Sequence, residues 1–327
     1  MLLKYLPDEP KIGFMKVRMA AFVLSCIMII ASIALVATRG LNFGIDFVGG
    51  VVLEVETPNE PINVGRIRDT LAPLNLGDIQ VTEVREVVAV DSAATVAMIR
   101  AGSPEGEGEE VELAVQAMTN SMIDTLKAEF EGLEIRRNEA VGPKVSGELM
   151  TDGVLALVVA LGLMLVYIWF RFQWQYSVGA ILALVHDIIL TIGMFAFTQF
   201  EFNLSTIAAL LTIVGYSMND TVVVYDRVRE ELRRYKKMPV TDVIDLSVNR
   251  TLSRTLLTSG TTLLALFAIF ILGGDVLRGF SFAMIWGIFV GTYSSIFIAS
   301  AILLQTGVRP GGKSDEDNEP IPHGAQV

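Results

Sequence analysis

Two ionisable residues, Asp220 and Arg254, stand inside long apolar stretches of this sequence. Charged groups in such stretches are costly to place in lipid, so they usually face a helix-bundle interior or a water-filled path and mark functional sites. The stretch that holds Asp220 begins near Leu204, and the stretch that holds Arg254 ends near Leu272. If the two helices run antiparallel, Leu204 and Leu272 lie at the same side of the membrane. At about 1.5 Å per residue, Asp220 then lies roughly 24 Å and Arg254 roughly 27 Å from that side. We therefore expect the two side chains at similar depth on antiparallel neighbouring helices.

This matched depth predicts an electrostatically coupled pair, for which two interpretations stay open. The pair is either a proton relay, whose contact breaks when Asp220 is protonated, or a static ion pair that locks two helices together. Hydroxyl side chains at helical spacing would line a polar seam beside the pair. They are Thr212, Tyr216 and Ser217 near Asp220, and Thr258, Thr261 and Thr262 near Arg254.

Five further residues are secondary candidates. His186 and Asp187 form a second polar point midway along another apolar stretch, where a lone histidine could also simply donate to a neighbouring carbonyl group. Arg250 and Thr258 lie one helical turn before and after Arg254. Asp46 follows the first apolar stretch, in a position where a turn or edge-strand role competes with a contact role.

Other chemistries are excluded by the residues present. The single Cys26 rules out an intrachain disulfide and a thiol-rich metal site, and two histidines without an HExxH motif argue against metal-dependent hydrolysis. Residues 307–314 match the spacing GxxxxGK[ST], but a phosphate loop needs a preceding strand and a following helix, and an acidic tail follows here. Positive charge with interleaved aromatic residues, as nucleic-acid binding requires, is missing. We expect no enzyme, no bound metal and no nucleic-acid partner.

The composition predicts a protein embedded in a lipid bilayer. Of 327 residues 52% are hydrophobic and 19% are charged, against about 25% charged in soluble domains, and the mean hydropathy is +0.53. The apolar residues gather in blocks of roughly 20, long enough to cross a bilayer as helices. Six such spans are expected, at 17–37, 151–170, 177–198, 204–225, 253–272 and 280–304.

The distribution of charge predicts the orientation. Lys and Arg gather near the N-terminus, between 226 and 252 and in the C-terminal tail, which places both termini in the cytoplasm. The segment between the first two spans carries nine basic and 20 acidic residues, a net charge of −11. The expected division is a cytoplasmic N-terminus at 1–16, a first span at 17–38, a periplasmic domain at 39–148, five further spans at 149–306 and a disordered cytoplasmic tail at 307–327.

Hydropathy patterns within this periplasmic segment predict a small α+β domain. Strands are expected at 51–57, 79–86, 95–101 and 133–140, and helices at 63–74 and 110–131. The order β-α-β-β-α-β is that of the split, ferredoxin-like unit. That fold hosts many unrelated activities, so it assigns no function by itself.

Five sequence runs closely resemble the SecD/SecF family of protein-export membrane proteins, within the resistance-nodulation-division (RND) superfamily. They are FGIDFVGG at 43–50, VGPKVSGEL at 141–149, VHD at 185–187, VGYSMNDTVVVYDRVRE at 214–230 and NRTLSRTLLTSGTTLLAL at 249–266. The resemblance covers nearly the whole chain. It implies a polytopic α-helical membrane protein that forms half of a twelve-helix RND bundle, six transmembrane helices with one ferredoxin-like extracytoplasmic domain between helices 1 and 2.

The resemblance also implies a function, with SecD as the partner half. The complex would associate with the SecYEG channel, with YajC as a further partner, and use the proton gradient to help unfolded secretory polypeptides emerge at the outer face of the bacterial inner membrane. Protons would be the coupling ion, without a cofactor. The family's proton-coupling carboxylate falls on Asp220 and its arginine on Arg254.

Two alternatives stay open beside this function. The chain could be half of a proton-driven small-molecule RND exporter, but such exporters usually have an internal duplication and large outer loops in both halves. It could be a binding domain tethered by an inert anchor, but an inert anchor would not need six helices with a buried aspartate.

Overall fold

The computed structural model describes residues 10–57, 63–77, 79–84, 96–104 and 109–308. Within these ranges six helical segments are long and apolar enough to cross a membrane, as expected. Five are α1 (Arg18–Arg39), α5 (Pro143–Arg171), α6 (Trp174–Thr198), α7 (Leu204–Arg234) and α8 (Val240–Leu272). The sixth runs through α9 (Gly274–Ser294), the π-helical turn η3 (Ser295–Ala299) and α10 (Ser300–Gln305).

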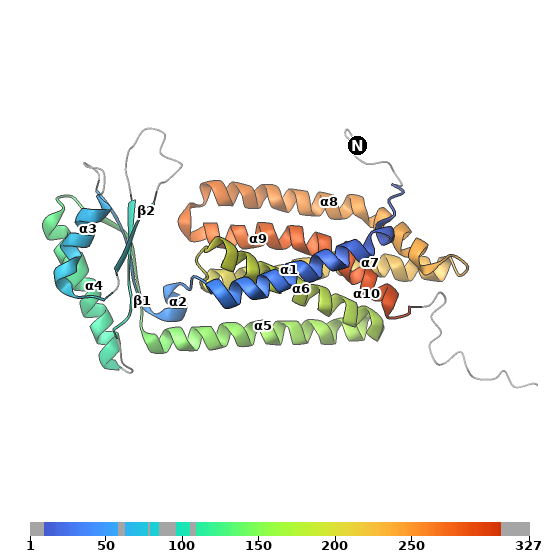
Figure 1. Cartoon of the computed structure of the whole chain (residues 1–327), viewed down its shortest axis with the longest axis horizontal. Coiled ribbons are helices and arrows are strands. Elements are labelled where there is room, and N and C mark those ends of the chain that lie inside the picture. Colours follow the sequence, from blue (N-terminus) through green and yellow to red (C-terminus); the bar gives the residue numbers. More distant parts are fainter. Residues whose placement is uncertain (1–9, 58–62, 78, 85–95, 105–108, 309–327) are drawn as a thin grey trace, which may run out of the picture.

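The six segments form one bundle with a small sheet domain at one end (Figure 1). Helices α6, α7 and α9 are its interior, whereas α1, α5 and α8 lie at its periphery and expose aliphatic side chains such as Ile30, Val158 and Leu264. Such an apolar outer surface suits a lipid environment. The start of α1 and the end of α10 lie together at the end of the bundle opposite the sheet (Figure 1).

Small residues let the helices of the bundle approach closely. A Cβ atom added at Gly193 of α6 would lie 2.1 Å from the Ser32 Oγ of α1, and one at Gly287 of α9 would lie 2.4 Å from the Ile213 side chain of α7. Contacts between helix backbones through small residues are a common basis of helix association in membranes.

Several helices extend well beyond the apolar runs that predict them. Helix α5 begins at Pro143 rather than near residue 151, α7 continues to Arg234 beyond residue 225, and α8 begins at Val240 instead of near residue 253. Hydropathy detects only the apolar part of a helix, so amphipathic turns that project from the bilayer are missed.

The sheet domain has the predicted element order. Its strands are β1 (Gly50–Glu56), β2 (Ile79–Val84), β3 (Val96–Ala101) and β4 (Glu134–Val141), and its helices are α3 (Val64–Leu71), extended by the turn η2 (Ala72–Leu74), and α4 (Glu109–Glu129). The strands pair in the order β2-β3-β1-β4, all antiparallel, which confirms the split β-α-β arrangement. The end of the predicted strand at residues 85 and 86 lies outside the described residues.

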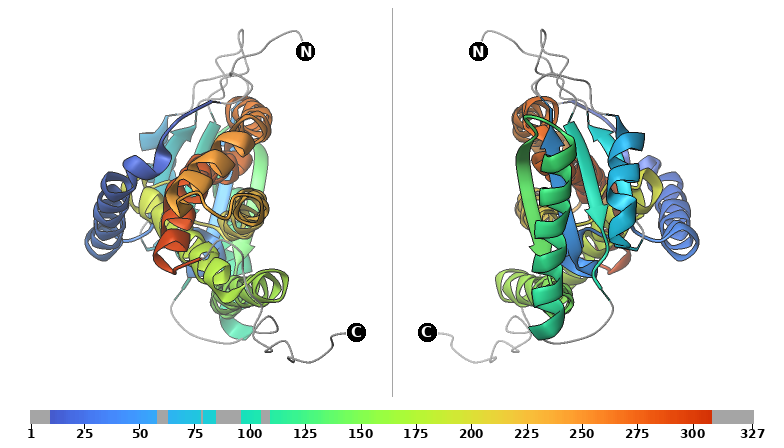
Figure 2. Two further views of the ribbon diagram at one scale, coloured as in Figure 1. Left: turned by 90° about the vertical axis from the view of Figure 1, so that its right-hand side faces the viewer. Right: turned by 90° about the vertical axis from the view of Figure 1, so that its left-hand side faces the viewer.

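Alternation along the strands gives the sheet two different faces. Val51, Leu53 and Val55 of β1 point toward α3 and α4, where they join a buried core with Met122 and Leu126. The two helices cover the side of the sheet that faces away from the bundle (Figures 1 and 2). The opposite, polar face is therefore turned toward the membrane-spanning helices.

Charged side chains order this polar face. Arg137 of β4 donates to Glu54 of β1 at 3.2 Å and to its own strand's Glu139 at 2.7 Å. Burial opposes the charge of Arg137, but the hydrogen bonds and negative charges of these two glutamates outweigh it and raise the pKa of the guanidinium. Arg137 therefore stays charged and ties β4 to β1.

Three contacts join the sheet domain to the bundle. Arg100 of β3 pairs with Glu201 in the α6–α7 connection, and Phe43 forms an isolated parallel bridge with Phe202. The short helix α2 (Ile45–Val48) packs on α5. The domain is thereby connected to the loop that leads directly into α7.

Candidate functional site

Asp220 lies in the centre of the bundle and is held by hydroxyl groups from two other helices. Its side chain is 8% exposed. Thr255 of α8 donates to Oδ1 at 2.6 Å, and Ser295, the first residue of the π-helical turn, donates to Oδ2 at 2.6 Å. Hydrogen bonds from donors to a charged carboxylate are the stronger ones in proteins. Asp220 therefore links α7, α8 and the C-terminal segment at one level.

A second layer of hydroxyl groups lies next to this carboxylate. Ser259 of α8 and Thr292 of α9 share a hydrogen bond of 3.1 Å, and Tyr216 of α7 donates to Ser259 at 3.3 Å. Ser259 lies one turn beyond Thr255, and Thr292 lies one turn before Ser295. The polar seam expected between neighbouring helices therefore exists, with a different membership from the one predicted.

The predicted hydroxyl residues mostly point elsewhere. Ser217 donates to Asp187, whereas Thr212, Thr258, Thr261 and Thr262 donate to carbonyl groups of their own helices. Thr255 and Ser295 were not predicted as partners of Asp220. The signal that would find them is a pair of hydroxyls at four-residue spacing in α8 (Thr255, Ser259) and a pair at three-residue spacing from the end of α9 into the π-helical turn (Thr292, Ser295).

Arg254 lies level with Asp220 but makes no ion pair with it among the described residues. The expected depth is confirmed, because the next residue, Thr255, touches the carboxylate. The expected direct contact is absent from this conformation. Since successive helix residues are about 100° apart around the axis, a helix that directs Thr255 inward turns Arg254 to the exposed face.

His186 and Asp187 form a second buried polar centre, on α6. The His186 Nδ1 lies 2.9 Å from Asp187 Oδ1, and its Nε2 lies 3.2 Å from the Ser25 hydroxyl of α1. Asp187 Oδ2 accepts from Ser217 of α7 at 2.6 Å and from Ser294 of α9 at 2.8 Å. Among the described residues the histidine does not donate to a backbone carbonyl group, the alternative that the sequence left open.

The remaining secondary candidates have structural contacts away from Asp220. Asp46 Oδ2 accepts from the backbone N–H of Leu204 at 2.8 Å, so it caps the N-terminus of α7, where a negative charge is favourable. Arg250 pairs with the fully buried Glu231 near the other end of α7, and Arg227 joins them at 3.0 Å. Glu231 was not singled out from the sequence, where it stands in an ordinary run of charged residues.

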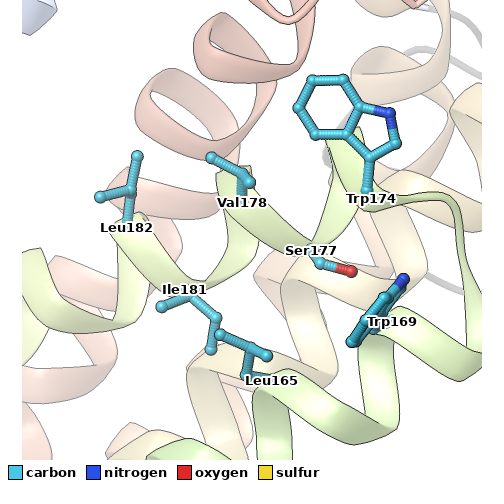
Figure 3. A pocket seen from close by; sticks show the side chains of 7 residues that line it. All are labelled: Leu165, Trp169, Trp174, Ser177, Val178, Ile181 and Leu182. Atoms are coloured by element: carbon cyan, nitrogen blue, oxygen red, sulfur yellow. The ribbon is translucent and has the colours of Figure 1, made fainter.

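An apolar groove opens on the outer surface between α5 and α6 (Figure 3). It is lined by Leu165, Trp169, Trp174, Ser177, Val178, Ile181 and Leu182. The two tryptophans stand at the ends of the helices, where aromatic rings favour the boundary between lipid and water. The groove offers no ionisable group for chemistry, so the carboxylate centres of the bundle are the candidate site.

The Asp220 centre suits reversible protonation better than covalent chemistry. An ionised carboxylate only accepts hydrogen bonds; once protonated, one of its oxygens becomes a donor that needs an acceptor and is itself a weaker acceptor. Ser295 has an alternative acceptor ready, the Thr292 carbonyl at 3.1 Å. Gain or loss of one proton can therefore change which helices are held together.

Comparison with known proteins identifies the relatives of this chain. The family described as protein export membrane protein SecD/SecF, C-terminal, matches residues 121–309, and the SecD/SecF GG motif matches residues 34–57. A protein translocase subunit SecF from Rhodobacter capsulatus is 48% identical, with 99% of this chain and 98% of the relative covered. A protein translocase subunit SecDF from Brucella abortus is 42% identical over 94% of this chain and 39% of its own length.

Solved structures show the same arrangement. A crystal structure of SecDF, a translocon-associated membrane protein from Thermus thermophilus, matches with a TM-score of 0.75 and 34% identity over 93% of this chain. A SecDF structure in a super-membrane-facing form matches with a TM-score of 0.64 and 36% identity, also over 93% of this chain. The chain spans 40% of the length of each of these two SecDF chains.

Proposed function

The chain belongs to the SecD/SecF family of protein-export membrane proteins, and from that premise we propose that it is an accessory subunit of the Sec protein-export machinery. It acts with a SecD partner and uses the proton gradient to promote translocation and release of unfolded secretory polypeptides at the outer face of the inner membrane. The complex works beside the SecYEG channel, with YajC as a further partner. Protons are the coupling ion, and the chain catalyses no covalent reaction.

One observation carries this proposal: an ionisable carboxylate, Asp220, is buried where three helical segments meet. Its partners Thr255 and Ser295 are neutral hydroxyls on α8 and the π-helical turn. Burial of a charge without a directly contacting cation is costly, and such groups in membrane proteins commonly mark ion or proton paths. A static ion-pair lock would need the cation to touch the carboxylate, and Arg254 does not touch it among the described residues.

Because Arg254 points outward from the bundle, we infer that another subunit supplies the group that neighbours its guanidinium. Its guanidinium lies on the exposed face of α8, in the part of the helix that is long and apolar enough to span lipid. Leaving an arginine against lipid is unfavourable, so a polar or acidic group of another subunit is the better neighbour. Relatives in which both halves form one longer chain, such as the SecDF of Brucella abortus, support SecD as that subunit.

In this proposal the sheet domain lies on the periplasmic side, and both ends of the chain lie in the cytoplasm. Basic residues concentrated at the end of the bundle opposite the sheet support this orientation. In this orientation Asp46, Arg100 and Glu201 lie between the export side and the helix that carries Asp220. A change at Asp220 can then reach the domain through α7.

The test is the substitution Asp220→Asn, which is nearly isosteric and removes only the ability to ionise. Inverted inner-membrane vesicles containing the chain and its SecD partner are supplied with a secretory precursor, with and without a proton gradient. We expect the gradient-dependent stimulation of export to fall to the level of vesicles that lack the chain, with assembly unchanged.

The matched control is Asp226→Asn on the same helix. Asp226 is exposed and lies 3.5 Å from Arg171, without contact to the hydroxyl seam. Its substitution should leave stimulation close to the original value. Full stimulation with Asp220→Asn would refute the proposed role of this carboxylate.

A further inference from the structure

The His186–Asp187 centre belongs to a hydrogen-bond network that reaches α1, α7 and α9. Around it, Tyr293 of α9 donates to the Ala21 carbonyl of α1 at 2.8 Å. The same tyrosine oxygen lies 3.0 Å from the Ser25 hydroxyl, which in turn lies 3.2 Å from His186 Nε2. His186 is 3% exposed and Asp187 fully buried, so no bulk water replaces a missing bond.

The number of protons available along this series of hydrogen bonds determines which atom donates in each bond. The single Tyr293 proton goes to Ala21, because a carbonyl oxygen only accepts. The Tyr293 oxygen must then accept from Ser25, which uses the one proton of that hydroxyl. Ser25 can therefore only accept from His186 Nε2, and one further proton lies between Nδ1 and Asp187 Oδ1. All of these bonds form together only when the His186–Asp187 pair holds one proton more than a neutral histidine beside an ionised carboxylate. The two serine donors to Asp187 Oδ2 favour the ionised carboxylate, which places this proton on the histidine ring.

If the network holds one proton fewer, one of its hydrogen bonds is lost. A bare Nε2 takes the Ser25 proton, and the Ser25–Tyr293 bond between α1 and α9 is lost. The proton on Nε2 thus determines whether α1 has two hydrogen bonds to α9 at this level or only the one from Tyr293 to Ala21. Helix α1 leads through α2 into β1 of the sheet domain, so this tie lies on a direct route out of the membrane.

Two neighbouring serines connect this centre to Asp220. Ser294 donates to Asp187, and the next residue, Ser295, donates to Asp220. On α7, Ser217 donates to Asp187 and lies three residues before Asp220, one helical turn away. The serines stand where α9 passes into its π-helical turn, an irregularity that often marks functional sites. Movement of Ser295 away from Asp220 therefore also displaces the donor of Asp187.

We propose that His186 and Asp187 hold a second proton in the bundle, as an imidazolium–carboxylate pair, and that Ser294 and Ser295 couple this pair to Asp220. The link to export rests on the proposed function, whereas the proton on His186 does not. The pair is neutral overall, which suits its burial in lipid better than a lone charge.

The groups that face this centre are few. Helix α1 presents Ser25, α7 presents Ser217 and Asp220, and α9 presents Tyr293 and Ser294. Among the described residues the titratable neighbours are therefore Tyr293 and Asp220. The thiol of Cys26 is exposed on α1 and points away.

Nitrogen NMR tests the protonation directly. The full chain is labelled with ¹⁵N-histidine and reconstituted in lipid nanodiscs with unlabelled SecD; His323 is the only other histidine of the sequence, so two residues need assignment. At about pH 7.5, where an ordinary exposed histidine is mostly neutral, both ring nitrogens of His186 should be protonated. A bare ring nitrogen at His186 would overturn the assignment.

Two pairs of variants test the network. Ser25→Ala removes the acceptor of Nε2–H and should leave His186 with one protonated nitrogen, whereas Ser32→Ala, at another buried serine of α1, should not change its spectrum. Asp220→Asn should shift the His186 resonances and Asp226→Asn should not. If Asp220→Asn and Asp226→Asn gave the same His186 spectrum, the coupling of His186 to Asp220 would be rejected. Because no arm measures export, failure here is distinct from failure of the proposed function.

Discussion

Asp220 touches two hydroxyl donors and no cation among the described residues, and this makes its contacts sensitive to a single proton. The ionised carboxylate satisfies Thr255 and Ser295 together. Protonation weakens the bond to one of them and adds an O–H that needs an acceptor, and Ser295 can turn to the Thr292 carbonyl. Proton uptake should therefore loosen α7 from α8 or from the π-helical turn, rather than break an ion pair.

The residue-scale prediction is that Thr255→Val impairs gradient-dependent export while the chain still assembles with SecD. Valine keeps the shape of threonine but removes the hydroxyl, so the carboxylate loses a hydrogen bond that is typically worth about 1.5–3 kcal/mol. The measurement is precursor export in vesicles. Thr261→Val is the control, since Thr261 is exposed on the same helix and donates to its own backbone. Unchanged export with Thr255→Val would show that this donor does not support Asp220.

At this scale the sequence predicted depth better than direction. Counting at a constant rise placed Asp220 level with the Arg254 region, because the rise of a helix is regular. The side that each residue faces depends on which stripe of α8 packs against the bundle, and α8 is apolar around most of its surface. Thr255, one residue further along, therefore makes the contact that was predicted for Arg254.

Gly193 lets the peripheral helix α1 pack closely on α6, and this contact gives the element-scale prediction. A Cβ at Gly193 would lie 2.2 Å from the Cβ and 2.8 Å from the Cα of Ser32, so α1 would have to move away from α6. Overpacking of this kind costs about 1–3 kcal/mol. We expect Gly193→Ala to lower the thermal stability of the purified chain by several degrees in a detergent-based unfolding assay.

Gly162→Ala is the matched control for this prediction. Gly162 lies on the exposed side of α5, and an added Cβ meets no atom within 4 Å. Its substitution should be neutral or slightly stabilising, as alanine is the better helix former. If both variants unfolded at the same temperature as the original chain, close packing of α1 on α6 would not limit stability.

Elements were more predictable than their ends. Strand alternation and the 3.6-residue period indicated the order of the sheet domain, because one face of each element is buried in the core around Leu53 and Met122. The six spans followed from length and hydropathy. The π-helical turn was not predictable, since its one serine and its apolar residues suit an ordinary helix equally well.

For the whole molecule, the orientation across the membrane is the prediction that most affects the proposed mechanism. In a background with Cys26→Ala, Ser121→Cys in α4 should react with an impermeant thiol reagent added to the periplasmic side of intact cells with a permeabilised outer membrane. Lys236→Cys, between α7 and α8, should react only after the inner membrane is opened. Both positions are exposed in the structure, so access is decided by the membrane. Labelling of both from one side would contradict six spans with an outward sheet domain.

The relation between the sheet domain and the bundle could not be derived from hydropathy. The Arg100–Glu201 pair and the Asp46 cap on α7 join segments that are 101 and 158 residues apart in the sequence. No local pattern indicates such partners. They give the molecule a connection from Asp220 along α7 to the polar face of the sheet.

The central claim is that Asp220 takes up and releases a proton during protein export. Infrared difference spectroscopy at varied pH tests this claim most directly. The chain is reconstituted with SecD, and spectra of the original protein are compared with those of Asp220→Asn and Arg254→Gln. We predict a protonated-carboxyl band that appears on acidification between about pH 4 and 9, the range from ordinary to buried carboxyl groups. The band should be absent in Asp220→Asn and altered in its pH dependence in Arg254→Gln. A spectrum without any Asp220 titration in this range would contradict a proton-coupled mechanism and favour a static structural carboxylate.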